Sequence, residues 1–253
     1  MYLDVVDLRD FYGDDLGRAV REILRARLRA RWPTVAGDRV LGIGYAIPYL
    51  GTFRDEAERV MAFMPAPQGV VNWPFEGPSA TALVDEDAMP LPDGSVDRVI
   101  LAHALEMADA PEDLLREVWR MLAPGGRVIA IVPNRRGMWA RVETSPFGYG
   151  RPFSRGQLTA LLKQTLFSPL GWGEALYMMP MRRRRTRRSA VRWERIGARL
   201  WPAFAGVIIV EAAKQVYQGI PAPRRARLVP AFRPVLVPQG AAPTTYTRED
   251  GND

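Results

Sequence analysis

Short apolar segments and segments with helical spacing alternate along most of this chain of 253 residues. The apolar segments are expected to form strands, and they lie at 39–41, 60–64, 81–84, 96–102, 127–132, 175–178 and 206–211. Two of them, 96–102 and 127–132, are rich in Val, Ile, Leu and Ala, which is typical of strands covered on both faces. Strands that alternate with helices indicate an α/β domain with a mostly parallel sheet of about seven strands.

Helices are predicted at about 14–33, before the first strand, at about 111–122 and 154–167 between strands, and over a short stretch between Arg188 and the last strand. One face of the first is apolar, with Leu16, Val20, Ile23, Leu24 and Leu28, and arginines occupy most of the other face. Asp14 and Ser154 can each accept hydrogen bonds from the free amides of a first helical turn. Pro111 suits the first helical position. We therefore predict a helical segment over 1–35 that packs on a main domain over 36–217.

The composition is that of an ordinary globular domain, and it limits the kinds of site available. Hydrophobic residues make up 47% of the chain and charged residues 25%. The absence of cysteine excludes disulfide scaffolds, thiol nucleophiles and zinc clusters of the cysteine type. No apolar run approaches the roughly 20 residues that a membrane-spanning helix needs. We expect a cytoplasmic protein that is not integral to a membrane and that has no metal site.

The charge of the chain is carried mainly by arginine, with a net charge of +7 and a pI of about 10.1. Six arginines occupy the seven positions from Arg182 to Arg188, and their mutual repulsion predicts an exposed loop. This loop could bind an acidic partner, whether nucleic acid, anionic lipid or an acidic protein, or it could be solvated surface. Residues 218–253 are rich in Pro, Arg and Ala, and we predict a disordered tail there.

A loop with two glycines follows the first predicted strand. Gly42 and Gly44 would let the backbone approach a ligand closely, at the strand end where parallel α/β sheets bind their ligands. Ile47 stands where a dinucleotide-binding fingerprint has its third glycine, and no Gly-Lys-Ser/Thr follows to make a P-loop. By itself the loop therefore fits a tight turn as well as a cofactor site.

The segment from Val84 to Gly126 carries a longer and more specific pattern. It contains the acidic strand end Asp85-Glu86-Asp87, then Leu91-Pro92, an Asp-x-Ser-x-Asp element, His103-Ala104-Leu105-Glu106, a Leu-x-Glu-x-x-Arg-x-Leu helix and the turn Pro124-Gly125-Gly126. This order resembles the type 11 class of S-adenosylmethionine-dependent methyltransferases, by motif over 38–133 and by layout as far as 217. The resemblance implies a Rossmann-like, doubly wound fold with helices on both faces of the sheet. It also implies S-adenosylmethionine as the cofactor and in-line transfer of its methyl group to an unknown acceptor.

The resemblance assigns roles to residues of this chain. The cofactor-binding residues that it implies are Gly42, Gly44, Ala46, Asp85, Glu86 and His103. Asp85 would accept hydrogen bonds from the adenine amino group, and Glu86 would present its backbone amide to the ring. His103, the single histidine, would lie beside the sulfur of the methyl donor. It is the one candidate catalytic residue, as a base or substrate anchor; the alternative is a hydrogen-bonded residue that shapes the pocket floor.

The chain departs from the family at the end of the second strand and in the glycine loop. In the family this strand ends in an acid that holds the ribose hydroxyls, but here it ends in Met64-Pro65. Losing such a charged hydrogen-bond pair costs about 1.5–3 kcal/mol, or about ten- to a hundredfold in affinity. Gln68, Asn72 and Glu76 are the nearby candidates to replace it. The glycine loop also lacks the acid that the family places beside its glycines.

Two hypotheses about function follow from these departures. In the first, the chain is a methyltransferase that binds its cofactor with altered ribose contacts. In the second, it is a catalytically inactive protein of methyltransferase fold that serves as a binding or regulatory subunit. A nicotinamide-dependent enzyme is a minor third alternative, which the missing third glycine disfavours.

The segment 134–155 follows the fifth predicted strand, where the resemblance places the choice of methyl acceptor. Asn134, Trp139 and Tyr149 stand there among arginines and glycines. Arginine and aromatic residues that alternate in a loop suit an acidic or planar ligand, such as a nucleotide. They equally suit a lid that packs over the pocket, and this is the interpretation we prefer.

Overall fold

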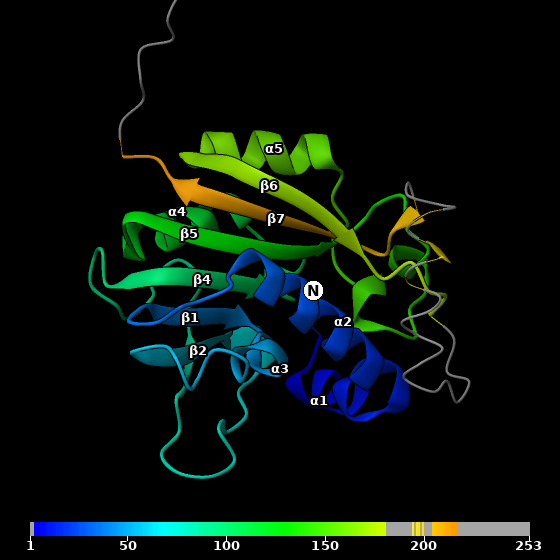
Figure 1. Cartoon of the computed structure of the whole chain (residues 1–253), viewed down its shortest axis with the longest axis horizontal. Coiled ribbons are helices and arrows are strands. Elements are labelled where there is room, and N and C mark those ends of the chain that lie inside the picture. The colour runs from blue at the N-terminus through cyan, green and yellow to red at the C-terminus, as the bar shows by residue number, and fades with distance from the viewer. Residues whose placement is uncertain (1–2, 181–193, 195, 198, 200–203, 217–253) are drawn as a thin grey trace, which may run out of the picture. The chain divides into compact units, whose positions relative to one another are not determined.

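The computed structural model describes residues 3–180, 194, 196–197, 199 and 204–216. These residues form a seven-stranded sheet in the order β3-β2-β1-β4-β5-β7-β6 (Figure 1). The neighbouring strands are parallel except where β7 pairs with β5 and with β6. The predicted fold class, a mostly parallel, doubly wound sheet, is therefore confirmed.

The strands are β1 Arg39–Gly44, β2 Arg59–Pro65, β3 Thr81–Val84, β4 Val96–Ala102, β5 Leu122–Pro133, β6 Phe167–Ala175 and β7 Val207–Lys214. The strand predicted at 175–178 is wrong in position. Strand β6 covers Phe167–Ala175 and ends at the residue where the predicted strand was expected to begin. Pro169 and two glycines interrupt the apolar pattern of β6, and the sheet tolerates them because β6 is an edge strand with a register shift. The first strand also continues through Gly44, since Gly42 and Gly44 pair with β4.

The helices are α1 Val5–Gly13, α2 Asp15–Arg31, α3 Ile47–Leu50, α4 Pro111–Met121 and α5 Arg155–Gln164, with short 3-10 turns η1 Ala66–Gln68, η2 Trp139–Arg141 and η3 Pro146–Gly148. Helix α1 lies within the predicted helical segment 1–35 but was not predicted as a helix of its own, although Asp4 accepts a hydrogen bond from the Val6 amide at its start, 2.7 Å away. The prediction that the third helix extends to 167 is wrong, because α5 ends at Gln164 and β6 begins at Phe167.

The predicted helix starts follow from local chemistry. Asp14 accepts a hydrogen bond from the Gly17 amide at 2.7 Å and begins α2. Ser154 accepts from the Gln157 amide at 3.2 Å, and the Gln157 side chain accepts in turn from the Ser154 amide at 3.0 Å, which makes a capping box. Pro111 occupies the first position of α4. These three predictions of helix starts are confirmed.

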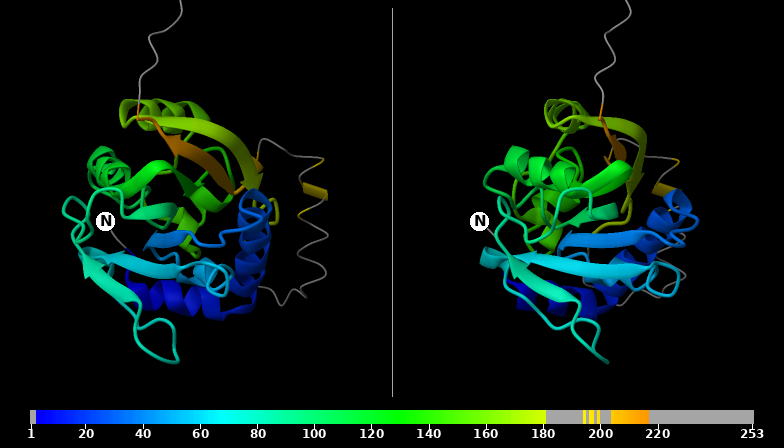
Figure 2. Two further views of the ribbon diagram at one scale, coloured as in Figure 1. Left: turned by 60° about the vertical axis from the view of Figure 1, so that its left-hand side comes forward. Right: turned by 90° about the vertical axis from the view of Figure 1, so that its left-hand side faces the viewer.

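Helices cover both faces of the sheet, as the two turned views in Figure 2 show. Successive side chains of a strand point to opposite faces, so β1 divides its residues between two cores. Val40 packs in the core formed with α1, α2 and α3. Leu41 and Ile43 pack in the core formed with α4 and α5. The sheet is thus the middle of three layers.

The order of the strands fixes where a ligand site is sought. The chain proceeds outward from β1 to β2 and β3, then returns to β4 on the other side of β1. Connections that diverge in this way leave a crevice at the carboxyl ends of the strands, where open α/β sheets bind ligands. Gly44 ends β1 beside Ala102, the last residue of β4. The crevice therefore lies over Gly44 and the residues that follow Ala102.

Two predicted features, Arg182–Arg188 and the tail 218–253, lie outside the described residues. Within the described part of the chain, no helix combines the length and the apolar character that crossing a bilayer requires.

Candidate functional site

Two glycines bring the carboxyl end of β1 close to its neighbours. Gly44 has a φ of +78°, and a Cβ there would lie 2.4 Å from the carbonyl oxygen of Ala102. A Cβ on Gly42 would lie 2.7 Å from the Cβ of Ala46, so this glycine lets α3 pack directly on β1. The predicted glycine loop, Ala46 included, thus lies at the crevice. In this structure the atoms nearest to Gly42 and Gly44 belong to neighbouring residues of the protein itself.

His103 directly follows β4 and is covered by tyrosines. Its backbone φ is 51°, a left-handed conformation that is uncommon outside glycine and that is concentrated at functional sites. The hydroxyl of Tyr12 lies 2.8 Å from His103 Nε2 and 2.6 Å from the hydroxyl of Tyr49. The Tyr12 ring also stacks on that of Tyr45, with 5.6 Å between the centroids. Helix α1 therefore places a tyrosine over the predicted methyl-donor end of the site.

The three tyrosines of this cluster are neutral phenols. Burial raises the pKa of Tyr12 well above its usual value, and the neighbouring Tyr49 raises it further. Burial likewise raises the pKa of Tyr49, and it raises the pKa of Tyr45 to about 12. Protonated phenols can both donate and accept hydrogen bonds. The cluster can therefore orient a polar ligand but cannot supply a phenolate base.

Several buried polar atoms around His103 have no hydrogen-bond partner among the described residues. They are Nδ1 of His103, both carboxylate oxygens of Glu106 and Oε1 of Gln68. His103 Nδ1 and Glu106 Oε1 lie 3.4 Å apart, but their geometry is not that of a hydrogen bond. Buried polar groups in native proteins are nearly always hydrogen-bonded, to protein or to another bound molecule. Their gathering at one place indicates a site that binds a polar ligand.

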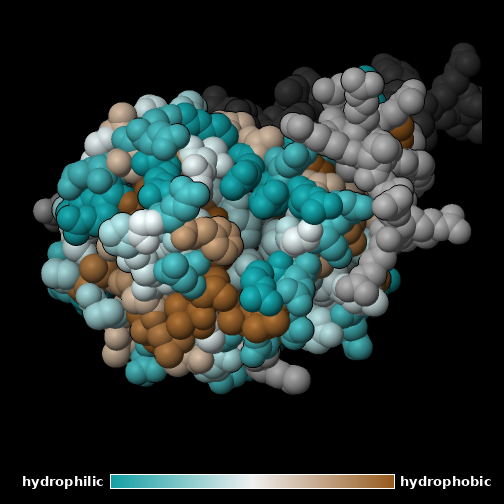
Figure 3. Space-filling view, turned by 90° about the horizontal axis from the view of Figure 1, so that it is seen from below, coloured by the Kyte–Doolittle hydropathy of each residue, from teal (hydrophilic) through white to brown (hydrophobic). Residues whose placement is uncertain are grey.

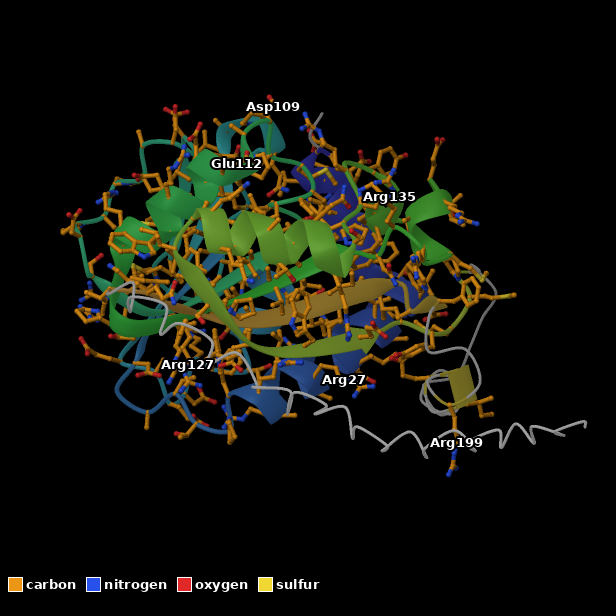
Figure 4. All side chains as sticks on the ribbon, turned by 90° about the horizontal axis from the view of Figure 1, so that it is seen from above. Arg27, Asp109, Glu112, Arg127, Arg135 and Arg199 are labelled. Carbon is orange, nitrogen blue, oxygen red and sulfur yellow. The ribbon has the colours of Figure 1, made fainter. Side chains whose placement is uncertain are left out.

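A second part of the crevice is an acidic cavity of about 240 Å³ at the ends of β3 and β4. Its lining includes Asp85 and Glu86 after β3, and Asp109 and Asp113 at the start of α4. Figure 4 shows Asp109 on the outside of the molecule, before α4. Asp113 pairs with Arg116, so its charge is partly compensated. The carboxylates at this end can accept hydrogen bonds from an exocyclic amine.

The segment after β2 contributes an amide where the family pattern has an acid. Gln68 lies in η1, is buried, and donates from Nε2 to the carbonyl oxygen of His103 at 3.1 Å. This hydrogen bond spans the end of β1 and orients the side chain. Asn72 and Glu76 lie in the exposed loop that follows. Of the three predicted replacements, Gln68 is the one that the structure brings to the unpartnered atoms.

The segment 134–155 packs against the same cluster. The ring of Phe147 lies 4.8 Å from that of His103. Asn134 donates to the carbonyl oxygen of Ala205 at 2.9 Å, and Trp139 donates to that of Met178 at 2.7 Å. Both side chains are therefore fixed by the protein itself. Tyr149 is half-buried and lines a separate surface groove beside α1.

Sequence reasoning missed Tyr12 and Tyr49, which bracket the site. The signal was present for Tyr12, because Val5, Leu8 and Tyr12 recur at helical spacing after a capping aspartate. Within the described residues, no group of three or more His, Asp and Glu side chains is arranged to hold a metal ion. The groups that the site presents are hydrogen-bonding atoms, aromatic rings and carboxylates.

Comparison with known sequences identifies one family. The sequence profile described as a methyltransferase domain matches residues 41–130, from β1 into β5. This range contains the glycine loop, the acidic strand end and His103. No curated protein sequence matches the chain significantly.

Solved structures share the fold of this chain. A chain from the complex between the Trm112 methyltransferase activator and a putative methyltransferase of Haloferax volcanii is 20% identical, with a TM-score of 0.58 over 83% of this chain and 99% of that one. A methyltransferase dependent on S-adenosylmethionine from Archaeoglobus fulgidus is 19% identical, with a TM-score of 0.56 over 77% and 94%. A possible histamine N-methyltransferase from Thermotoga maritima is 16% identical, with a TM-score of 0.54 over 83% and 96%. At such identities the likeness shows the fold alone.

Proposed function

We propose that the chain transfers the methyl group of S-adenosylmethionine to an acceptor by in-line displacement. Residues 41–130 form a methyltransferase domain of the type 11 family, and S-adenosylmethionine is its cofactor. The observation that carries the proposal is the set of buried, unpartnered polar atoms on Gln68, His103 and Glu106. They lie at the carboxyl ends of β2 and β4, where a ligand of this fold binds. The acidic cavity at Asp85 extends the same crevice toward β3.

Each part of the crevice suits a different part of the cofactor. The carboxylate of Asp85 would accept from the adenine amine, and Glu86 lines the same cavity. The unpartnered Oε1 of Gln68 would accept from a ribose hydroxyl. This neutral amide would replace the acid of the family pattern, with weaker binding than a charged partner gives.

The methyl-donor end combines a buried carboxylate with a fixed histidine. When bound, the cofactor supplies a methyl group on a cationic sulfur, which is a good leaving group, so that positioning provides much of the rate. The buried carboxylate of Glu106 would favour a positive charge beside it. His103 Nε2 is already engaged by Tyr12. We therefore assign His103 to shaping the pocket rather than to proton transfer.

Calorimetry with S-adenosylhomocysteine tests this proposal. We expect the wild-type protein to bind, and Asp85→Asn to bind about tenfold more weakly, because a charged acceptor becomes a neutral amide. Asp55→Asn, an exposed acid remote from the crevice in the segment before β2, is the matched control and should bind like the wild type. No binding of millimolar ligand by the wild type would contradict the proposal and favour the inactive binding subunit. Equal affinities of the two variants would remove Asp85 from the site.

Three finer assignments belong to the same proposal. The segment 134–155, with Asn134, Trp139 and Tyr149, would act as a lid over the crevice, supported by the contact between Phe147 and His103. The protein would act in the cytoplasm, and Arg182–Arg188 would contact an acidic partner. Binding of a short DNA duplex that weakens steeply with added salt would fit a nucleic-acid partner. Salt-independent binding would exclude it.

A further inference from the structure

A groove of about 330 Å³ lies beside the residues that follow Gly44, and its lining includes Tyr12 and Tyr45 of the tyrosine cluster over His103. It lies between α1, α2, α3 and the loop that joins β2 to β3. We call it the arginine–aromatic groove, and the side chains that matter here are Arg9, Arg21, Arg25, Tyr45, Trp73 and Phe75. The groove and the acidic cavity share no lining residue. The two are therefore separate features of the surface.

Two arginines of this groove are neighbours on α2. Arg21 and Arg25 lie one turn apart, and the charge of Glu22 acts on Arg25 in the opposite sense to that of Arg21. Arg25 is held in place because its Nε donates to the carbonyl oxygen of Pro48 at 2.6 Å. Nε of Arg21 is buried without a hydrogen-bond partner. Arg25 is thus held in place, and Arg21 beside it keeps a buried donor without a partner.

The electrostatics agree with this geometry. Burial lowers the pKa of Arg25, and the like charge of Arg21 lowers it further, while Glu22 offsets the effect in part. Arg9 adds a third guanidinium from α1, although it also contacts Asp10 at 3.2 Å. An anion bound between these groups would relieve their repulsion. A guanidinium offers several donors in a planar fork, which suits a phosphate or a carboxylate.

Aromatic side chains form the rest of the groove. Tyr45 is buried at its floor, and Trp73 is half-buried. Phe75 is 86% exposed, the highest value among the large hydrophobic side chains described as exposed. Figure 3 shows that hydrophobic side chains also gather on the face of the molecule seen from below. Such rings provide flat apolar surfaces against which another ring can stack.

We propose that the arginine–aromatic groove binds a small organic anion, a planar ring that carries a phosphate or carboxylate group. The anionic group would lie between Arg21 and Arg25, and the ring would stack against Phe75 and Trp73. An inorganic anion would leave the aromatic rings without a contact, and a neutral ring would leave the buried Nε of Arg21 without a hydrogen-bond partner. A ligand that combines a ring with an anionic group satisfies both halves of the groove. The proposal does not depend on methyl transfer.

Calorimetric titration of the protein with 1-naphthyl phosphate, in the absence of any methyl donor, tests whether the groove binds such an anion. We expect 1-naphthyl phosphate to bind at least about tenfold more tightly than either 1-naphthol or inorganic phosphate. Arg21→Gln should weaken that binding about tenfold, because a charge-assisted hydrogen bond is lost. Arg18→Gln is the matched control, since Arg18 is exposed on the same helix and pairs with Asp15. It should leave binding unchanged.

A second variant addresses the aromatic half. Phe75→Ser should weaken 1-naphthyl phosphate about three- to tenfold, with no effect on folding, because the ring is almost fully exposed. Equal affinity for 1-naphthol and 1-naphthyl phosphate would overturn the proposal, since the arginines would then play no part. A loss in Arg18→Gln as large as that in Arg21→Gln would also overturn it. That result would mean unspecific attraction to a basic protein.

Discussion

At the amino ends of β1 and β4 the charged groups are fully paired, whereas at the carboxyl ends of the same strands several buried polar atoms have no partner. Asp97 accepts from the backbone amide and Nε of Arg39 at 2.9 Å each, and from its Nη2 at 3.1 Å. Arg98 donates to Asp38 at 2.8 Å. At the other end, the carboxylate of Glu106 is buried and accepts no hydrogen bond from the described residues.

The difference separates structural from functional polarity. A buried polar atom without a hydrogen-bond partner lowers the free energy of unfolding by about 1–3 kcal/mol. The unpartnered atoms at the carboxyl ends therefore make the protein less stable than paired atoms there would. Stability that a site gives up in this way is recovered when a ligand supplies the missing partners. Three predictions test whether the two ends differ as this argument requires.

The largest effect is expected at Gly44. Gly44→Ala introduces a Cβ 2.4 Å from the Ala102 carbonyl oxygen at a φ of +78°. The free energy of unfolding should fall by about 3–5 kcal/mol, from the left-handed backbone and the overlap together. Denaturant unfolding followed by circular dichroism measures it.

Gly37 provides the matched control, at the other end of β1. Its φ is +77°, but a Cβ there would have no neighbour within 4 Å. Gly37→Ala should therefore cost only the backbone part, about 1–2 kcal/mol. If both variants lose the same stability, the close approach of β1 and β4 at the crevice is not what requires a glycine there.

The layered fold was predictable from the sequence where burial leaves a strong pattern. Strands β4 and β5 are covered on both faces, so their apolar runs are long. Strand β6 was misplaced because Pro169, Gly171 and Gly173 weaken the pattern in an edge strand. Helix α1 was not recognised as a separate helix because it has nine residues and only a short apolar stripe, Val5, Leu8 and Tyr12. A local sequence pattern predicts a helix or strand well only where packing requires a regular spacing of apolar residues.

The site was predictable only in part. Asp85, Gly44 and His103 stand in motifs of fixed spacing, so a resemblance could locate them. The contact of Tyr12 with His103 joins residues 91 positions apart, and that of Gln68 with His103 joins residues 35 apart. Such pairings depend on the tertiary fold and leave no mark on local spacing. The lost acid at the end of β2 was visible in the sequence, but the amide in its place needed the structure.

Glu106→Gln should give the next largest effect, and with opposite signs for stability and binding. The substitution replaces a buried carboxylate, whose oxygens accept no hydrogen bond from the described residues, with an amide of nearly equal volume, so the free energy of unfolding should rise by about 1–2 kcal/mol. If Glu106 favours the cationic methyl donor, affinity for S-adenosylmethionine should fall about tenfold. Calorimetry and denaturant unfolding on the same preparation measure both quantities.

Glu112→Gln is the control for this pair of measurements. Glu112 is exposed in the first turn of α4 (Figure 4) and should change neither quantity noticeably. A Glu106→Gln variant that is less stable than the wild type would contradict the comparison, because Glu106 would then have a stabilising partner. The carboxyl end would be as structural as the amino end.

The smallest effect on the free energy of unfolding is expected for Asp97→Asn. This substitution should lower the stability, whereas Glu106→Gln should raise it. The hydrogen bonds from Arg39 hold the pKa of Asp97 below its usual value, despite some burial. A lowered folded-state pKa means that the ion pair stabilises fully above the usual aspartate value of about 3.9, and that this stabilisation is lost as pH falls through the folded pKa. Asp97→Asn should therefore cost about 1 kcal/mol near neutral pH, and its difference from the wild type should shrink steadily below about pH 4. Unfolding measured from pH 7 to pH 3, with Asp55→Asn as control, would show it. A difference that stays constant over this range would mean that Asp97 acts by shape rather than by charge, and the amino end would owe its stability to packing alone.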